Sequence, residues 1–330
     1  EPREYVYGAR DRVDEVFDLS RSVRNGKYLY IRNFMPHLPW HQPSAWPDQG
    51  EFRDEFNRLS RAIQSGEMTE EDFTAPQWAY LAAPKPLEEL YDCEADPMNL
   101  VNLAVDAPHY DAMNNDDYAE MWIMRKELFS WMQDYCDLGA IPESIAWSLL
   151  SEETPTPWDF QFNITEAYQL LNYTNHFDCM RIFFQPDHFG IHNSIATWKQ
   201  CDDVERFWET ALWREGDVSE EHAVQLFHAA LNDDFPTIRI EAAGALARYE
   251  EHREEALAVL AKVISEDDGS QVDGANLLHA TRTIELIYPD AVELEGDVCA
   301  MLDRLEGHRA ANQFIQFSGE AFLKRIEERE

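Results

Sequence analysis

Residues 21–33 have the sequence RSVRNGKYLYIRN, and this stretch decides the fold of the first half of the chain. Asn25-Gly26 is a strong signal for a tight turn, because both residues accept the positive φ angles that short hairpin loops favour. Tyr28–Ile31, after the turn, is rich in residues that favour strands, and Arg21–Arg24 lies before it. The pattern predicts a β-hairpin over residues 20–34.

Two further elements are expected around this hairpin. Leu90-Tyr91-Asp92 predicts a short strand that ends before Asp96-Pro97. Residues 116–135 predict a helix, because apolar and aromatic residues recur there at spacings of three and four. The residues of this pattern are Tyr118, Met121, Trp122, Arg125, Leu128, Phe129 and Met132, and Asn114, Asn115 or Asp116 can cap its start. The fold expected for residues 1–145 is α+β, a small antiparallel sheet with a long helix packed on one face.

The second half of the chain has a different pattern. Pro142, Pro155 and Pro157 mark a connecting segment, which we assign to residues 146–200. Helical periodicity then recurs in four stretches, residues 234–247, 254–265, 275–288 and 298–305. Helices with one apolar face must stack to bury it. We therefore expect an all-α helical repeat domain over residues 201–330, in which residues 200–305 form a short solenoid.

The charge of the chain narrows the choice of partners. It has 64 Asp and Glu residues against 27 Lys and Arg, which gives a net charge of −37. Such a surface repels phosphate backbones, so nucleic acid is not an expected partner. An ordinary acidic surface and adaptation to high salt both fit this charge. No apolar run approaches the roughly 18 residues of a membrane span, so no membrane partner is expected either.

The cysteines and the first residues give weaker indications. The five cysteines are widely spaced and form no Cys-x-x-Cys pair, which argues against a disulfide framework and a zinc ribbon. His188 and His192 are four residues apart and fit either a zinc site or ordinary packed histidines. The sequence starts at Glu1 without Met or a signal-peptide pattern, so we expect that something upstream has been removed.

Four stretches of the first half, in this order, resemble the C-terminal subdomain of the type I, formylglycine-dependent sulfatases. They are Tyr5–Arg12, Arg21–Asn33, Lys85–Asp92, and Asp96-Pro97 leading to Asn102-Leu103-Ala104. The heparan N-sulfatase branch (N-sulfoglucosamine sulfohydrolase) is the most similar. In the second half, Asp233–Leu246 has the pattern Asp-x-x-Pro-x-Ile-Arg-x-x-Ala-Ala-x-Ala-Leu and resembles the HEAT-like repeats that some bacterial sulfatases carry.

The resemblance implies sulfate ester or sulfamate hydrolysis on a sulfated carbohydrate. Members of that family need a formylglycine, made in a Cys/Ser-x-Pro-x-Arg signature, and a calcium ion held by paired carboxylates. None of the five cysteines lies in such a signature. We therefore expect no catalytic residue, metal ligand or cofactor in this chain, and place formylglycine and calcium in a missing N-terminal domain. A typical bacterial parent would be periplasmic or extracellular.

The resemblance also implies that this subdomain supplies one wall of the substrate pocket. The candidate substrate-binding residues are Arg10, Asp11, Arg12, Asp14, Glu15, Arg21, His37 and His41. We expect a strand over residues 5–7, an exit at Gly8, and then a charged loop at the sheet edge. Arginine there can fork onto sulfate or carboxylate groups, and carboxylates can accept sugar hydroxyls. The same loop also fits a surface with internal salt bridges, and Arg21 also fits a residue on the hairpin face.

The two histidine candidates belong to the loop over residues 35–49, which is rich in Pro and Trp. A histidine beside Trp40 could stack on a sugar, and a packed loop that braces the sheet explains it as well. Two functions remain open at this point. The chain is either the C-terminal part of a sulfatase, acting on a sulfated sugar together with the missing domain, or a non-catalytic scaffold whose helical repeats bind a protein partner.

Overall fold

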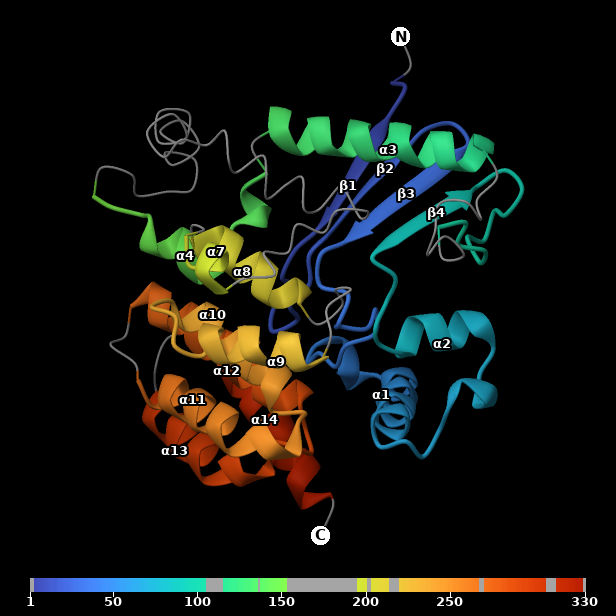
Figure 1. Ribbon diagram of the computed structural model, residues 1–330. Coiled ribbons are helices and arrows are strands. Elements are labelled where there is room, and N and C mark those ends of the chain that lie inside the picture. The colour runs from blue at the N-terminus through green and yellow to red at the C-terminus, as the bar shows by residue number, and fades with distance from the viewer. Residues whose placement is uncertain are drawn as a thin grey trace. The chain divides into compact units, whose positions relative to one another are not determined.

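The computed structural model describes residues 3–104, 115–135, 137–152, 195–200, 203–213, 220–266, 270–306 and 313–328. The chain divides into two compact units, Glu1–Asp137 and Leu138–Glu330. The first contains a four-stranded antiparallel sheet and the second is built from helices (Figure 1). The predicted α+β fold class is confirmed.

The sheet forms from one hairpin and two flanking strands. Its strands are β1 (Val6–Arg10), β2 (Ser20–Arg24), β3 (Tyr28–Asn33) and β4 (Glu88–Asp92), and they lie in the order β1-β2-β3-β4. The hairpin predicted over residues 20–34 is therefore confirmed as β2 and β3. Its turn, however, does not use a positive φ at Gly26. The Asn25 side chain shapes it instead, because Asn25 Oδ1 accepts the backbone N–H groups of Lys27 (2.9 Å) and Tyr28 (2.7 Å).

Strand β1 is longer than the sequence indicated. We expected the strand to end at Gly8, but it continues to Arg10 at the edge of the sheet. Gly8 lies opposite Ser22, and a Cβ atom at Gly8 would lie only 2.7 Å from Ser22 Oγ. The glycine therefore permits a close approach of two strands and not a chain exit.

Helix α3 (Asn115–Asp134) packs on one face of the sheet, as the periodicity of residues 116–135 predicted (Figure 1). Met121, Met124, Leu128 and Met132 of this helix are all buried. At the C-terminal end of the helix, Trp131 stacks on Tyr7 of β1 with ring centroids 5.0 Å apart. Burial of side chains of this size contributes about 1.5–3 kcal/mol each, so this face forms the core of the first unit.

The long connection from β3 to β4 carries the remaining helices of the first unit. These are η1 (Pro47–Gln49), α1 (Glu51–Gln64), η2 (Glu70–Asp72) and α2 (Ala75–Leu81). A capping box starts α2, in which Gln77 Oε1 accepts the backbone N–H of Thr74 (2.9 Å). Helices α1 and α2 contact each other (Figure 1). They position Arg53 and Tyr80, which contribute to the hollow described below.

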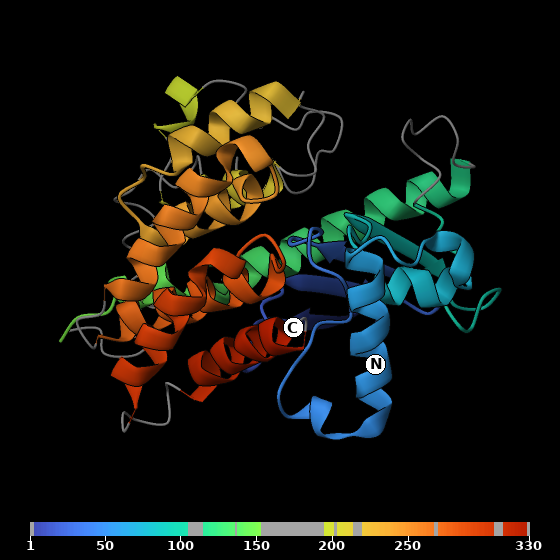
Figure 2. The ribbon, with the colours of Figure 1, turned by 90° about the horizontal axis from the view of Figure 1, so that it is seen from below.

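The second unit is a stack of helices. Its elements are η4 (Leu138–Ala140), α4 (Glu143–Ser148), α7 (Ile195–Trp198), α8 (Asp203–Leu212), α9 (Glu220–Ala230), α10 (Pro236–Leu246), η6 (Glu250–His252), α11 (Arg253–Ser265), α12 (Gln271–Leu286), η7 (Val292–Leu294), α13 (Glu295–Leu305) and α14 (Gln313–Glu327). Alternate helices pack in a row, α8 on α10, α10 on α12 and α12 on α14, while α11 packs on α13 (Figure 2). This two-row order is the one that stacked helical hairpins produce.

Helix α10 lies at the centre of that stack. It contacts α8, α9, α11 and α12, and nine of its eleven residues are buried. Its sequence explains this, because its alanines and Gly244 let neighbouring helices approach closely. Two polar side chains of α10 are buried as well, and both bind His279 of α12: Thr237 Oγ1 lies 2.9 Å from His279 Nδ1, and Glu241 Oε1 lies 2.9 Å from His279 Nε2. These contacts tie the two helices together.

Some of the predictions concern residues that the structure does not describe. Most of the expected connecting segment, residues 146–200, falls in this class, and so do His188 and His192 of the zinc hypothesis. Among the helices that are described, none is long and apolar enough to cross a membrane.

Candidate functional site

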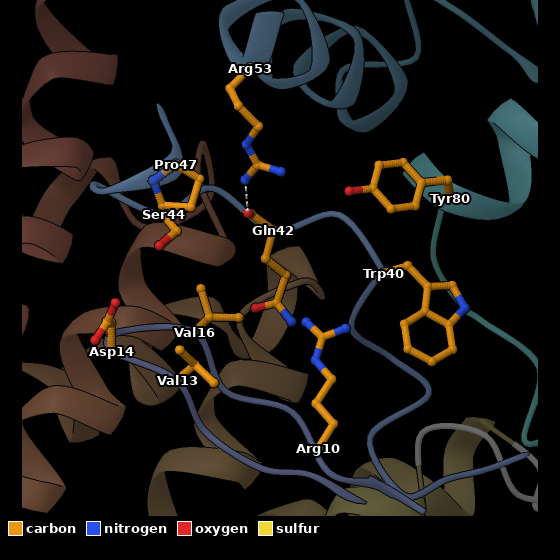
Figure 3. Close-up of a pocket in the computed structure, with 10 residues that line it drawn as sticks. All are labelled: Arg10, Val13, Asp14, Val16, Trp40, Gln42, Ser44, Pro47, Arg53 and Tyr80. Atoms are coloured by element: carbon orange, nitrogen blue, oxygen red, sulfur yellow. Dashed lines mark hydrogen bonds between the residues drawn. The ribbon is translucent and has the colours of Figure 1, made fainter. Parts of the chain in front are cut away.

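A hollow of about 350 Å³ lies in the first unit (Figure 3). It forms where the end of β1, the turn after it, the loop over residues 35–49, and helices α1 and α2 meet. Its lining residues are Arg10, Val13, Asp14, Val16, Trp40, Gln42, Ser44, Pro47, Arg53 and Tyr80. Two arginines, one carboxylate and two large aromatic rings therefore share one concave surface, and its volume is in the range of small-ligand sites.

One side of the hollow carries cations beside an aromatic ring. The Arg10 guanidinium lies 5.5 Å from the centre of the Trp40 ring, and Lys85 Nζ lies 4.5 Å from it. Lys85 Nζ donates to both oxygens of Asp18 at 2.7 Å, and this pair is fully buried. Burial lowers the pKa of Lys85, and the charge of Asp18 opposes that shift without cancelling it. The buried ion pair fixes the surroundings of Trp40, whereas Arg10 keeps 35% of its side chain exposed.

Arg53 enters the hollow from the other side, from α1 (Figure 3). Its Nε donates to Asp48 Oδ1 at 2.8 Å, and its Nη2 donates to the backbone oxygen of Gln42 at 2.8 Å. Its Nη1 lies 3.1 Å from His41 Nδ1. Three contacts from three directions hold the guanidinium in one orientation.

These contacts also determine the protonation of His41. A guanidinium can only donate, so His41 Nδ1 must accept from Arg53 and carries no proton. The proton then lies on Nε2, which donates to Asn57 Oδ1 at 2.9 Å. Asn57 Nδ2 in turn donates to Asp48 Oδ2 at 2.6 Å. Arg53, His41, Asn57 and Asp48 thus form a closed ring of hydrogen bonds, and His41 is neutral within it.

Asp14 lines the hollow from a strained turn. Val13 and Val16 exchange two backbone hydrogen bonds, of 3.0 and 2.9 Å, across this turn. Asp14 between them has a φ of 56°, in the left-handed region that a residue with a side chain rarely adopts. Within the part of the chain that the structure describes, no donor reaches the Asp14 carboxylate. The Asp14 carboxylate is therefore an acceptor that a ligand in the hollow can use.

The structure brings Arg10 and Asp14 into the hollow and gives the neighbouring candidates other partners. Asp11 Oδ1 accepts from Arg21 Nη2 at 2.8 Å. Arg12 donates to the backbone oxygen of Asp14, within its own turn. Glu15 is buried, and its Oε1 accepts the backbone N–H of Ala45 at 2.6 Å, which connects the turn to the loop over residues 35–49.

The remaining candidates are buried away from the hollow surface. Arg21 forms two hydrogen bonds to Asp137, from Nε at 2.6 Å and from Nη2 at 2.9 Å, and only 1% of its side chain is exposed. Burial works to lower the pKa of Arg21, but Asp137 and Asp11 outweigh it and raise that pKa. His37 and His41 are both buried. In this structure Arg21 supports the sheet face, and His41 supports Arg53.

Several lining residues were not singled out in the sequence. Trp40 and Gln42 lie in the loop that drew attention through its Pro and Trp content, but Gln42 was not singled out there, and Arg53 and Tyr80 belong to no motif. They come from a loop and two helices spread over about forty residues. Only the tertiary fold brings them together, so no sequence spacing could have indicated them.

A second hollow of about 810 Å³ in the first unit is acidic. Asp92, Asp96, Asp116 and Asp117 line it together with Lys27. Asp92 and Asp96 already accept backbone N–H groups, and Lys27 Nζ lies 3.2 Å from Asp92. Among the described residues, no three His, Cys, Asp or Glu residues are placed to hold a metal ion.

Within the described part of the chain, the residues do not match the cofactors that the resemblance implies. Of the two cysteines in the described part of the chain, Cys93 Sγ lies 3.5 Å from Asn99 Oδ1 in a turn after β4, and Cys299 is exposed on α13. Neither lies in a formylglycine signature, and the described carboxylates form no calcium cage.

Comparison with known proteins gives one similarity, over part of the chain. A stretch of 143 residues, 43% of this chain, is 34% identical to an ulvan-active sulfatase from Formosa agariphila. The stretch covers 21% of that relative, so the chain matches about a fifth of its length. No family model and no solved structure matches this chain. The chain therefore contains a sulfatase-like region.

Proposed function

We propose that this chain is the C-terminal part of a sulfatase, a sulfuric ester or sulfamate hydrolase that acts on a sulfated carbohydrate. In this proposal the first unit supplies one wall of the substrate pocket, and the similarity of 143 residues to a sulfatase is the observation that carries it. The relative is named as active on ulvan, so ulvan is one substrate to test. Because the first half of the chain resembles the heparan N-sulfatase branch, sulfated glucosamine is a second substrate to test.

The hollow supports the pocket-wall role through its chemistry. Arg10 and Arg53 are able to donate paired hydrogen bonds to sulfate or carboxylate oxygens. Asp14 offers an acceptor for sugar hydroxyls, and Trp40 and Tyr80 offer apolar ring surface. Tyr80 has 39% of its surface exposed, which is enough to meet a ligand. Concave sites with few polar groups among aromatic rings are typical of small-molecule recognition.

The chemistry itself is proposed to lie outside this chain. The formylglycine nucleophile and the calcium ion would belong to an N-terminal catalytic domain of the same parent protein, in the periplasm or outside the cell if the parent is bacterial. The helical unit would be a HEAT-like extension behind the subdomain. Its two-row stacking supports that assignment, and a protein partner is proposed for its surface.

Activity measurements on this chain and on its full-length parent test the proposal. Both would be given sulfated glucosamine and ulvan, with and without calcium. The chain alone is expected to be inactive, and the parent to release sulfate in a calcium-dependent reaction. Turnover by the chain alone would contradict the proposal.

The alternative is a non-catalytic scaffold that has kept a sulfatase-like region. The row of helices α8, α10, α12 and α14 favours it, since stacked helices offer an extended surface to a protein. A parent without any sulfate release, in which this chain nevertheless holds a protein partner, would support the scaffold.

A further inference from the structure

We propose that Arg53 is the residue of the hollow that recognises an anionic substituent, a sulfate or a carboxylate, on a bound sugar. This inference rests on the proposed function and adds to it the particular side chain and the chemical group that it binds. It starts from the difference between the two arginines that line the hollow. Arg10 is at the outer end of an edge strand, whereas Arg53 is fixed in a ring of partners.

The first argument is preorganisation. Arg53 keeps only 19% of its side chain exposed, and Asp48, His41 and the Gln42 backbone each hold one of its nitrogens. A free arginine loses side-chain entropy when it binds an anion, but a guanidinium already held in place loses little. Groups fixed in this way bind with good geometry and without rearrangement.

The second argument is the number of donors. A guanidinium has five N–H groups, and the three contacts of Arg53 use one on each nitrogen. Within the described residues, no acceptor takes the second N–H of Nη1 or of Nη2. Arg53 lines the hollow, so these two donors remain for a ligand (Figure 3). Two N–H groups on adjacent nitrogens match the spacing of two oxygens of a sulfate or a carboxylate.

The third argument concerns the residues behind Arg53. His41 and Asn57 complete the ring to Asp48, at 2.9 Å between His41 and Asn57 and 2.6 Å between Asn57 and Asp48. His41 and Asn57 are both buried, and within the ring Arg53 is the one member that lines the hollow. His41, Asn57 and Asp48 are therefore positioning residues, and Arg53 is the group that meets the anion.

Binding measurements on the intact chain test the inference. Isothermal titration would use three oligosaccharide probes of equal length, one sulfated, one carboxylated and one neutral. Arg53→Gln is expected to weaken binding of an anionic probe about ten- to a hundredfold, the range for a lost hydrogen bond to a charged group, and to leave the neutral probe unchanged. The anionic probe whose affinity falls in Arg53→Gln, sulfated or carboxylated, identifies the group that Arg53 binds. Arg58→Gln is the matched control, because Arg58 lies on the same helix, pairs with Glu55 and is exposed.

Two further variants keep the test decisive. Arg53→Lys retains the charge but loses the paired N–H donors of the guanidinium, so it is expected to lose most of the same affinity. It replaces Arg53→Gln if that variant does not fold. Asn57→Leu opens the ring, and it is expected to weaken only the anionic probes and to shift the ¹⁵N resonance of His41 Nε2. Anionic binding that is unchanged in the Arg53 variants but lost in Arg10→Gln would overturn the inference and leave the proposed function standing. A chain that binds none of the three probes would overturn both.

Discussion

At the scale of single residues, the most informative group is the charged row on the sheet face beneath α3. Arg21, Arg32 and Glu88 are cross-strand neighbours on β2, β3 and β4. Arg125 of α3 forms two hydrogen bonds to Glu88, and Tyr30 donates a third. Arg32 Nη1, by contrast, lies 3.9 Å from Glu88 Oε1, and the described residues give its guanidinium no hydrogen-bond acceptor.

This difference leads to unequal expectations for the two arginines. Arg32→Met should lower the free energy of unfolding by less than Arg125→Met does, because the charge of Arg32 helps to lower the pKa of Glu88 but its guanidinium forms no hydrogen bond with the described residues. Arg125→Met should lower it by about 3 kcal/mol, since it removes the hydrogen-bonded partner of a buried carboxylate. Urea unfolding of both variants measures this. Equal losses in the two would show that Arg32 stabilises the fold as much as Arg125 does.

Glu88 also predicts how the stability depends on pH. Burial raises the pKa of Glu88, but Arg32 and Arg125 outweigh it and bring that pKa below its ordinary value of 4.5. A carboxyl with a depressed pKa stabilises the fold fully above its unfolded pKa, and this contribution is lost as the pH falls through the folded pKa. The free energy of unfolding should therefore decrease as the pH is lowered from about 4.5 through the folded pKa of Glu88. In Glu88→Gln the stability should be lower at pH 7 and should change less with acid, and a wild-type slope in this variant would contradict the assignment.

At the scale of elements, the hairpin turn shows a local sequence signal that was right for a different reason. Asn25-Gly26 marks the turn, yet the side chain of Asn25 makes the contacts. Besides its two bonds to backbone N–H groups, Asn25 Nδ2 donates to Glu120 Oε1 of α3 at 2.7 Å. One residue therefore closes the turn and attaches it to the helix.

Substitution of the two turn residues separates these explanations. Asn25→Ala should cost about 2 kcal/mol in the free energy of unfolding, because it removes three hydrogen bonds. Gly26→Ala is the control and should change it by less than about 0.5 kcal/mol, since no atom lies within 4 Å of the added Cβ and Gly26 has no positive φ. Thermal melting of both variants checks this. A larger loss for Gly26→Ala would restore the explanation by backbone conformation.

The elements also show what the sequence could and could not predict. The hairpin and α3 follow from local patterns, turn residues and a helical period, so they were predictable. Arg21 was a candidate ligand because it is charged and lies near a sheet edge, but its alternation on β2 turns it under α3 toward Asp137. That partner is 116 residues away in sequence. Arg53 and Tyr80 escaped notice for the same reason, because their neighbours in the hollow come from distant segments.

At the scale of the whole molecule, the net charge of −37 is the dominant property. Repulsion between carboxylates destabilises a compact chain, and salt screens it over a distance that shortens from about 10 Å at 0.1 M to about 3 Å at 1 M. The melting temperature should therefore rise between 0.1 and 1 M NaCl. Calorimetry at both salt concentrations measures this, and a melting temperature that falls with added salt would contradict adaptation to high salt.

The central claim is that the first unit forms one wall of a sulfatase substrate pocket. The most direct test is steady-state kinetics of the full-length parent on a sulfated oligosaccharide, with Arg10→Gln compared with the exposed Arg58→Gln. Removal of a group that binds substrate and transition state alike should raise KM about tenfold or more with little change in kcat, and the Arg58 variant should behave as wild type. If Arg10→Gln and Arg53→Gln both match the wild-type KM, the hollow is not part of the substrate pocket.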